Sequence, residues 1–292
     1  MVHKTKIIAA IPAYNEEKYI GTVVLKTKQY VDEVIVVDDG STDQTGDIAR
    51  LAGAIVIQHK RNKGYGASIQ TILAEAKERS PNILVLLDAD SQHNPDEIPN
   101  LIKTIFDGYD LTIGSRVQQG SNTPRYRRIG QRVLSYFSRI LSGERVADSE
   151  CGLRAFSPKA IAELKLTQNG MAISAEMIAV AAERGLKIKE VPVSAIYTKD
   201  GSTLNPLVHG LGNLAAIITM ISERRPLILF GLFGLIMTVL GLIAGVRVLY
   251  TISIGGGIAT GTALLSTLFL IIGIFSIFTG IVLNVLVKRR KD

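Results

Sequence analysis

The chain of 292 residues contains no tryptophan, a single cysteine and few charged residues. Cys151 cannot form an internal disulfide, which suits a reducing compartment. Charged residues make up 20% and hydrophobic residues 47%, and the mean hydropathy is +0.27. This composition excludes a disordered or fibrous chain and indicates that part of the chain lies in lipid.

Charge is nearly absent from two long stretches near the C-terminus. Residues 226–249 contain one charged residue, Arg247, and residues 262–287 contain none. At about 1.5 Å per residue, each helix would exceed a hydrocarbon core of roughly 30 Å. With the uncharged glycine-rich loop at 255–257, they predict a transmembrane hairpin within residues 226–288. The alternative is two buried helices of a soluble core.

The basic residues gather at the two ends of this hairpin. Seven basic residues and one acidic residue lie from Arg224 onward, so this end carries +6 of the formal net charge of +7. Arg224 and Arg225 precede the first span, and a basic tail at 289–292 follows the second. The positive-inside rule therefore predicts an integral membrane protein whose N-terminal domain is cytoplasmic. Because the excess charge belongs to the membrane segment, no nucleic acid is expected as a partner.

The first 115 residues alternate between apolar runs and polar, helix-compatible stretches. The apolar runs lie at residues 7–11, 34–37, 55–57, 83–87 and 111–113. This alternation predicts an α/β fold with a mostly parallel sheet, and ligands in such folds bind beyond the carboxyl ends of the strands. The turn after the first run has neither the glycine fingerprint of dinucleotide-binding folds nor a P-loop. A Rossmann oxidoreductase is therefore excluded.

Two carboxylates follow the fourth apolar run. Asp88 and Asp90 are two residues apart, so they point the same way and repel each other unless a cation lies between them. Gln92 continues the spacing with a neutral oxygen. These oxygen ligands suit Mg²⁺ or Mn²⁺, which would keep positions open for a diphosphate. The alternative is a solvated acidic turn before the helix that begins near Pro95.

Another acidic pair follows the second apolar run. Asp38 and Asp39 can accept hydrogen bonds from a base or a ribose, while Ser41 or Thr42 can instead cap the next helix. His59 and His93 have no metal-like spacing to other ligands. We expect both histidines to be surface residues or local hydrogen-bond partners.

Five motifs stand in order along the first 116 residues. They are Pro12-Ala13-Tyr14-Asn15-Glu16, Val36-Val37-Asp38-Asp39-Gly40-Ser41-Thr42-Asp43, Asn62-Lys63-Gly64, Asp88-Ala89-Asp90-Ser91-Gln92 and Gly114-Ser115-Arg116. Together they resemble the family 2 glycosyltransferases of the GT-A fold, and in particular the polyprenyl-phosphate hexose synthases of the dolichol-phosphate mannose synthase type. Weaker similarity continues through residues 148–156, Glu176 and the strand at 191–193. Ser91 departs from the hydrophobic residue or glycine that is usual there.

The resemblance implies a role for each motif. Asp90 and Arg116 would be catalytic, with Arg116 on a phosphate, and Asp88, Asp90 and Gln92 would hold the metal. The nucleotide-binding residues would be Pro12, Tyr14, Glu16, Asp38, Asp39, Lys63 and Asp88.

A basic stretch follows these motifs. Seven arginines and a single acid, Glu144, lie within residues 116–145. Near residues 124–142 the apolar side chains recur at helical spacing, which predicts an amphipathic helix with one basic face at a membrane surface. Arg127, Arg128 or Arg132 could pair with a lipid phosphate there. The alternative is an amphipathic core helix with a solvated basic face.

These predictions combine into one organisation. Residues 1–200 would form a GT-A (Rossmann-like) catalytic domain, residues 201–225 an interfacial helix or linker, and residues 226–288 the hairpin. The predicted reaction is inverting, metal-dependent transfer of a hexose from a nucleotide diphosphate sugar, with GDP-mannose favoured, to polyprenyl (dolichyl) phosphate. Homo-oligomerisation is compatible with the sequence.

Three alternative functions compete with this one. A UDP-glucose-dependent transferase and a non-catalytic, membrane-tethered nucleotide-sugar-binding protein both stay open. A processive polysaccharide synthase is disfavoured, because its Gln-x-x-Arg-Trp motif requires a tryptophan.

Overall fold

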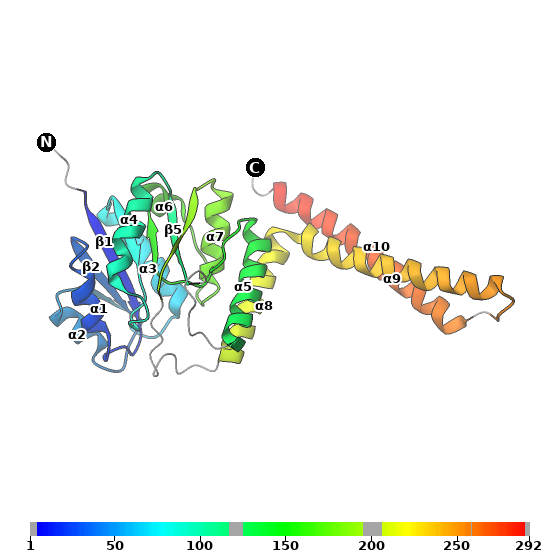
Figure 1. The fold of residues 1–292 in the computed structure, drawn as a ribbon, viewed down its shortest axis with the longest axis horizontal. Coiled ribbons are helices and arrows are strands. Elements are labelled where there is room, and N and C mark those ends of the chain that lie inside the picture. Colours follow the sequence, from blue (N-terminus) through cyan, green and yellow to red (C-terminus); the bar gives the residue numbers. More distant parts are fainter. Residues whose placement is uncertain (1–4, 117–124, 195–205, 258, 290–292) are drawn as a thin grey trace. The chain divides into compact units, whose positions relative to one another are not determined.

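The computed structural model describes residues 5–116, 125–194, 206–257 and 259–289. The chain divides into two compact units, Met1–Ile217 and Ile218–Asp292. Each unit is described by itself below (Figure 1).

The first unit is built on a sheet of seven strands. The strands are β1 (Ile7–Ala13), β2 (Glu33–Asp38), β3 (Ile55–Gln58), β4 (Ile83–Leu86), β5 (Leu111–Ser115), β6 (Arg154–Phe156) and β7 (Ile188–Pro192). Their order across the sheet is β3-β2-β1-β4-β6-β5-β7. Strand β6 is antiparallel to both of its neighbours, β4 and β5, whereas the other pairs are parallel. The predicted α/β class is thereby confirmed.

Helices cover this sheet, and the chain between them follows the predicted alternation. The helices of the first unit are α1 (Ile20–Thr27), α2 (Thr45–Leu51), α3 (Tyr65–Arg79), the 3-10 turn η1 (Pro95–Glu97), α4 (Ile98–Phe106), α5 (Arg125–Ser142), α6 (Pro158–Glu163) and α7 (Ile173–Glu183), and α8 (Pro206–Arg224) runs into the second unit. Six of the seven residues of β1 are buried although successive side chains point to opposite faces, so both faces of the central sheet are covered. This burial explains why the central strands are nearly continuous apolar runs.

The strand directions bring several loops to one edge of the sheet. Strands β1, β2, β4 and β5 run the same way, so the residues that follow them meet at their carboxyl edge. Because β6 runs the other way, its first residue, Arg154, pairs with Leu86 and Ile113 near the ends of β4 and β5. The loop that precedes β6 therefore reaches the same edge.

The second unit is a helical hairpin of α9 (Pro226–Ser253) and α10 (Thr260–Arg289). Both helices are long and apolar enough to cross a membrane, with mean hydropathies of 2.7 and 2.6. Small residues let them approach closely: a Cβ on Gly234 would lie 2.6 Å from the carbonyl oxygen of Gly273. The Ser266 hydroxyl also donates to the carbonyl of Gly241 at 2.7 Å. The hairpin is held by close packing and interhelical hydrogen bonds, as is usual in lipid.

Candidate active site

Three carboxylates interact beyond the ends of β1 and β4. Burial and the negative charges of Asp90, Asp43 and Asp88 raise the pKa of Glu16 to about 7. Burial, and then the charge of Asp88, also raises the pKa of Asp90 above its ordinary value. Asp88 therefore makes ionisation of both Glu16 and Asp90 harder, and Asp90 does the same for Glu16, which is the electrostatic condition that a bound cation relieves.

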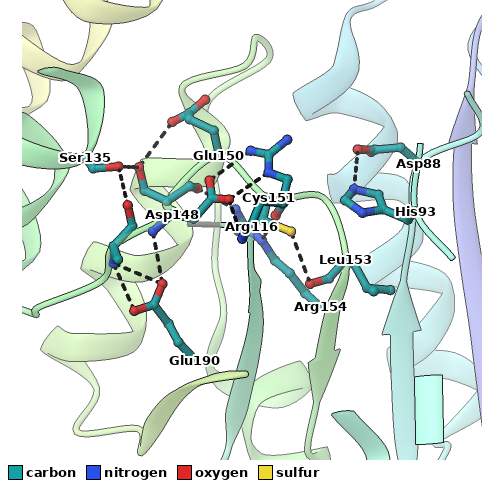
Figure 2. A network of polar contacts seen from close by, with 12 residues as sticks. Asp88, His93, Arg116, Ser135, Asp148, Glu150, Cys151, Leu153, Arg154 and Glu190 are labelled. Atoms are coloured by element: carbon teal, nitrogen blue, oxygen red, sulfur yellow. Dashed lines mark hydrogen bonds and ion pairs between the residues drawn. The ribbon is translucent and has the colours of Figure 1, made fainter. Parts of the chain in front are cut away.

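Asp88 differs from the other two because cationic and hydroxyl groups surround it. The Tyr65 hydroxyl donates to Oδ1 of Asp88 at 3.2 Å. Nε2 of His93 lies 3.5 Å from Oδ2 of Asp88 (Figure 2). Burial alone would raise the pKa of Asp88, but His93, Tyr65 and Arg116 outweigh it and the pKa lies below its ordinary value. Of the two expectations for His93, a surface position is wrong because the residue is buried, and a local polar partner is confirmed.

The segment after Asp88 folds into a tight turn. Ser91 adopts a positive φ of 62°, and the backbone amide of Gln92 donates to Oδ1 of Asp90 at 3.0 Å. Among the described residues, no three His, Cys, Asp or Glu side chains converge as a complete metal site. Asp88, Asp90 and the Gln92 amide oxygen could hold a cation only with further ligands from a bound molecule, such as a diphosphate.

The two aspartates after β2 face different surroundings. Asp38 is fully buried: its Oδ1 accepts the amide of Ser41, and its Oδ2 has no hydrogen-bond partner among the described residues. Asp39 accepts the backbone amides of Lys63 at 3.0 Å and Gly64 at 2.8 Å. It thus ties the end of β2 to the start of α3, and its contact with a nucleoside stays a prediction.

His59 is the side-chain partner of Asp39. Nδ1 of His59 lies 2.7 Å from Oδ1 of Asp39, and Nε2 lies 3.0 Å from the Thr71 hydroxyl. Because His59 is buried, the surface expectation is wrong for it also, while the expected local hydrogen bond is confirmed.

The loop after β1 is fastened to the loop after β2. The amide of Asn15 donates to the Ser41 hydroxyl at 3.0 Å, and the amide of Thr42 donates to Oδ1 of Asn15 at 2.9 Å. Pro12 is buried within β1, whereas the Tyr14 side chain directly beyond the strand is 44% exposed. The exposed ring of Tyr14 is available for stacking against a planar group.

Arg116 follows β5 and is paired with a carboxylate from the loop before β6. Its Nε and Nη2 donate to the two oxygens of Asp148 at 2.7 and 2.8 Å, and its backbone amide donates to Asp148 as well (Figure 2). Burial opposes ionisation of Asp148, but Arg116 outweighs it and the pKa lies below its ordinary value. The charge of Arg116 also lowers the pKa values of Asp88 and Asp90, so this guanidinium belongs to the same site.

Sequence reasoning missed the residues that hold Asp148 in place. Glu190 of β7 accepts the backbone amides of Ala147 and Asp148 at 2.9 and 3.0 Å, and the Ser135 hydroxyl of α5 donates to the Ala147 carbonyl. Buried Arg154 donates to the carbonyls of Ser149 and Cys151 at 2.8 and 2.9 Å (Figure 2). The contacts of Glu190 join residues more than 40 positions apart, and the side-chain contacts of Arg154 depend on how the loop folds, so the spacing of residues in the sequence predicts neither.

Gly152 in the same loop lies directly against the Asp88 carboxylate. A Cβ at Gly152 would overlap the Asp88 carboxylate, so the position requires glycine. The sequence offers only a weak signal for it, the continued family similarity through residues 148–156.

The structure describes the side chain of only one of the three proposed acceptor arginines. Arg132 is exposed on α5, together with Val133 and Tyr136. Arg127 and Arg128 lie in the same helix, but their side chains are outside the described residues.

Comparison with known proteins agrees with this architecture. Residues 8–164 match the model of glycosyl transferase family 2. The chain is 37% identical over 218 residues to the UDP-N-acetylglucosamine–dolichyl-phosphate N-acetylglucosaminyltransferase of Methanococcus voltae, covering 66% of this chain and 86% of that protein. It is 32% identical over 216 residues to the dolichyl-phosphate hexose transferase of Haloferax volcanii, covering 73% and 92%.

A solved structure shares the fold. The crystal structure of glucosyl-3-phosphoglycerate synthase from Mycobacterium tuberculosis with Mn²⁺, UDP and phosphoglyceric acid superposes with a TM-score of 0.61 at 21% identity. The match covers 75% of this chain and 78% of that one. The GT-A fold and the enzyme class predicted from the sequence are thereby confirmed: this chain is a glycosyltransferase and belongs to glycosyl transferase family 2.

Proposed function

We propose that this protein transfers a hexose from a nucleoside diphosphate sugar to the phosphate of a polyprenyl lipid. The proposal rests mainly on two features that occur in one chain. A carboxylate cluster lies at the carboxyl edge of a GT-A sheet, and two helices are long enough to cross a membrane. The cluster suits a metal-bound diphosphate, and the helices keep the enzyme at the lipid that supplies its acceptor. The names of the relatives from Methanococcus and Haloferax, both of which act on dolichyl phosphate, support the acceptor class.

The side chains at the site fit a divalent cation. Asp88 and Asp90 offer hard oxygen ligands. Burial and the neighbouring carboxylates raise the pKa values of Asp90 and Glu16, and a cation bound there would offset this negative charge. In the proposal Asp88, Asp90 and Gln92 hold Mg²⁺ or Mn²⁺. When bound, the cation neutralises the charge that develops on the departing nucleoside diphosphate.

The donor is proposed to lie across the ends of β1, β2 and β4. Pro12, Tyr14, Glu16, Asp38, Asp39 and Lys63 would surround the nucleoside, and Arg116 would face a phosphate. The resemblance to dolichol-phosphate mannose synthases favours GDP-mannose as the donor. The relative from Methanococcus, named for UDP-N-acetylglucosamine, and the mycobacterial structure with UDP make uridine donors the alternative.

The acceptor needs little activation. A phosphate monoester has its second ionisation near pH 6, so it is mostly a dianion at neutral pH and can attack without a strong general base. Attack in line with the departing diphosphate would invert the anomeric carbon. Arg127, Arg128 and Arg132 on α5 are proposed to hold this phosphate, since guanidinium groups bind phosphate in a bidentate manner.

We propose that the reaction takes place at the cytoplasmic face of the membrane. Arg224 and Arg225 precede α9, and basic residues end α10, while Gly255 and its neighbours between the helices are uncharged. By the positive-inside rule both ends of the hairpin, and with them the catalytic unit, are cytoplasmic.

A donor panel tests the proposed function. The full-length protein in detergent is given GDP-mannose, UDP-glucose or UDP-N-acetylglucosamine, with Mg²⁺ or Mn²⁺ and a short polyprenyl phosphate, and the released nucleoside diphosphate is measured. We expect one donor to give release that requires both the lipid phosphate and the metal. Release from no donor, with nucleotide binding intact, would favour the non-catalytic binding protein instead.

A further inference from the structure

Glu176 is a buried carboxylate among the mostly apolar residues of helix α7. Every residue of α7 from Ile173 to Ala181 is buried, and Glu176 is 0% exposed. A carboxylate in such surroundings is costly unless hydrogen bonds satisfy it. Glu176 accepts hydrogen bonds from the Thr167 hydroxyl at 2.7 Å, the Thr167 amide at 3.0 Å and the Gln168 amide at 2.9 Å. Its side chain therefore fixes the backbone of residues 167 and 168, and through them the position of the adjoining Asn169.

Residues 167–169 in turn lie against the first turn of α3. The amide of Gly66 donates to the Asn169 carbonyl at 2.7 Å, and Nε2 of Gln70 donates to the Gln168 carbonyl at 3.0 Å. A Cβ on Gly66 would overlap the backbone of Gln168 and Asn169. The two segments thus meet backbone to backbone, where a shift of one moves the other.

The first turn of α3 carries Tyr65, which touches the acidic pair. Its hydroxyl donates to Oδ1 of Asp88 at 3.2 Å. On the preceding residue, the amide of Gly64 is held by Asp39 at 2.8 Å. The turn that presents Tyr65 is therefore fixed from two sides, by Asp39 and by the segment that Glu176 holds.

We propose that Glu176 is a positioning residue for the metal site: it fixes residues 167–169 against α3 and so keeps the Tyr65 hydroxyl on Asp88. This inference rests on the proposed function, because it takes Asp88 as a ligand of the donor-bound metal. It assigns Glu176 no contact with substrate and no proton transfer. Both oxygens of the Glu176 carboxylate accept hydrogen bonds from residues 167 and 168.

The test is Mn²⁺ binding, which needs no turnover. Mn²⁺ is titrated into the full-length protein in detergent with GDP or UDP, and free Mn²⁺ is followed by electron paramagnetic resonance. Glu176→Gln should weaken Mn²⁺ binding about three- to tenfold, because a misplaced Tyr65 loses its hydrogen bond to Asp88. Glu183→Gln, on the exposed end of the same helix, is the matched control and should bind as wild type does.

A double-mutant cycle separates positioning from general loss of structure. In a Tyr65→Phe background, which already lacks the hydroxyl, Glu176→Gln should weaken binding by no more than about twofold. Equal losses with and without the Tyr65 hydroxyl would overturn the proposal. Should Glu176→Gln fail to fold, Thr167→Val removes one of the hydrogen bonds to Glu176 and should still weaken Mn²⁺ binding about two- to threefold.

Two failures can be told apart. Unchanged Mn²⁺ binding in Glu176→Gln, or in Thr167→Val, would overturn the positioning role while Asp90→Ala still abolishes binding. Unchanged binding in Asp90→Ala would overturn the metal site itself, and with it both proposals.

Discussion

Asp88 and Asp90 lie two residues apart, yet the site shifts their pKa values in opposite directions. The pKa of Asp88 is lowered because His93, Tyr65 and Arg116 outweigh its burial, whereas burial and Asp88 raise the pKa of Asp90. The protein thus keeps Asp88 ionised, whereas ionisation of Asp90 is the one that a bound cation would favour most. Glu16, with its pKa at about 7, makes the charge of the site depend on pH near neutrality.

This dependence gives a prediction for metal binding. Between pH 6 and pH 8 Glu16 loses its proton, so Mn²⁺ affinity should rise by about tenfold, in step with the ionised fraction. Glu16→Gln should flatten this rise, and Glu17→Gln, next in the chain, should leave it unchanged. Titrating Mn²⁺ into the protein at several pH values measures the affinity at each pH. If the affinity of Glu16→Gln rose as steeply with pH as that of the wild type, another group would be responsible.

The raised pKa of Glu16 also affects folding: a rise in pH should strengthen metal binding but lower the stability of the metal-free protein. The folded-state pKa of Glu16 lies above its ordinary value of 4.5, so its contribution to stability is present below about pH 4.5 and is lost as the pH rises through about 7. Without added metal, the melting temperature should therefore fall less between pH 6 and pH 8 in Glu16→Gln than in the wild type.

Local spacing predicts only part of the site. The sequence places Asp88, Asp90 and Arg116 directly after apolar runs, and all three follow strands at one edge of the sheet. The partners Tyr65, His93 and Asp148 come from other segments. Their contacts depend on tertiary packing, which periodicity does not report. The metal and nucleotide roles of the predicted residues remain proposals.

At the scale of elements, strands and helices with a strong apolar pattern could be predicted from the sequence. Short or polar elements could not. Each of the five predicted apolar runs coincides with one of the strands β1 to β5, to within two residues at either end. Strand β6 has three residues and begins with Arg154, so it has too little apolar pattern to be found, and its position between β4 and β5 makes the sheet mixed. Helix α1 begins only at Ile20, because the backbone amides of residues 15–17 donate hydrogen bonds to side chains of the segment after β2.

Helix α5 carries the proposed acceptor site and gives a prediction at this scale. Replacing the true phosphate ligand among Arg127, Arg128 and Arg132 by alanine should remove a charge-assisted contact of about 1.5 to 3 kcal/mol. That corresponds to roughly a tenfold to more than hundredfold loss in kcat/KM for the lipid. Binding of the nucleotide should be unchanged.

Measuring initial rates at varied concentrations of the lipid phosphate gives this loss in kcat/KM. Arg139 is exposed on the same helix, and Arg139→Ala is the matched control. If all three alanine variants keep wild-type lipid kinetics, the acceptor phosphate binds elsewhere and α5 serves only as a basic surface.

At the scale of the whole molecule, the proposed topology can be tested by labelling. Cys151 is fully buried, so the wild-type chain should take up little maleimide. A cysteine at Gly257, where a Cβ has open space, should react with an impermeant maleimide added outside intact cells. Glu78→Cys, exposed on α3, should react only after the membrane is opened. Labelling of Glu78→Cys from outside intact cells would contradict the proposed orientation and place the catalytic unit on the outer side.

The most direct measurement of the central claim is formation of the lipid-linked sugar itself. Wild-type protein and Asp90→Ala are incubated with the active donor, Mg²⁺ and polyprenyl phosphate, and the polyprenyl-phosphate hexose is quantified by mass spectrometry. We expect product from the wild type, none in excess chelator, and recovery when Mg²⁺ is restored. Asp90→Ala should fall below about 1% of the wild-type rate, a loss of roughly 3 kcal/mol or more, while its melting temperature stays near that of the wild type. Product formed at the wild-type rate by Asp90→Ala, or in excess chelator, would contradict the account.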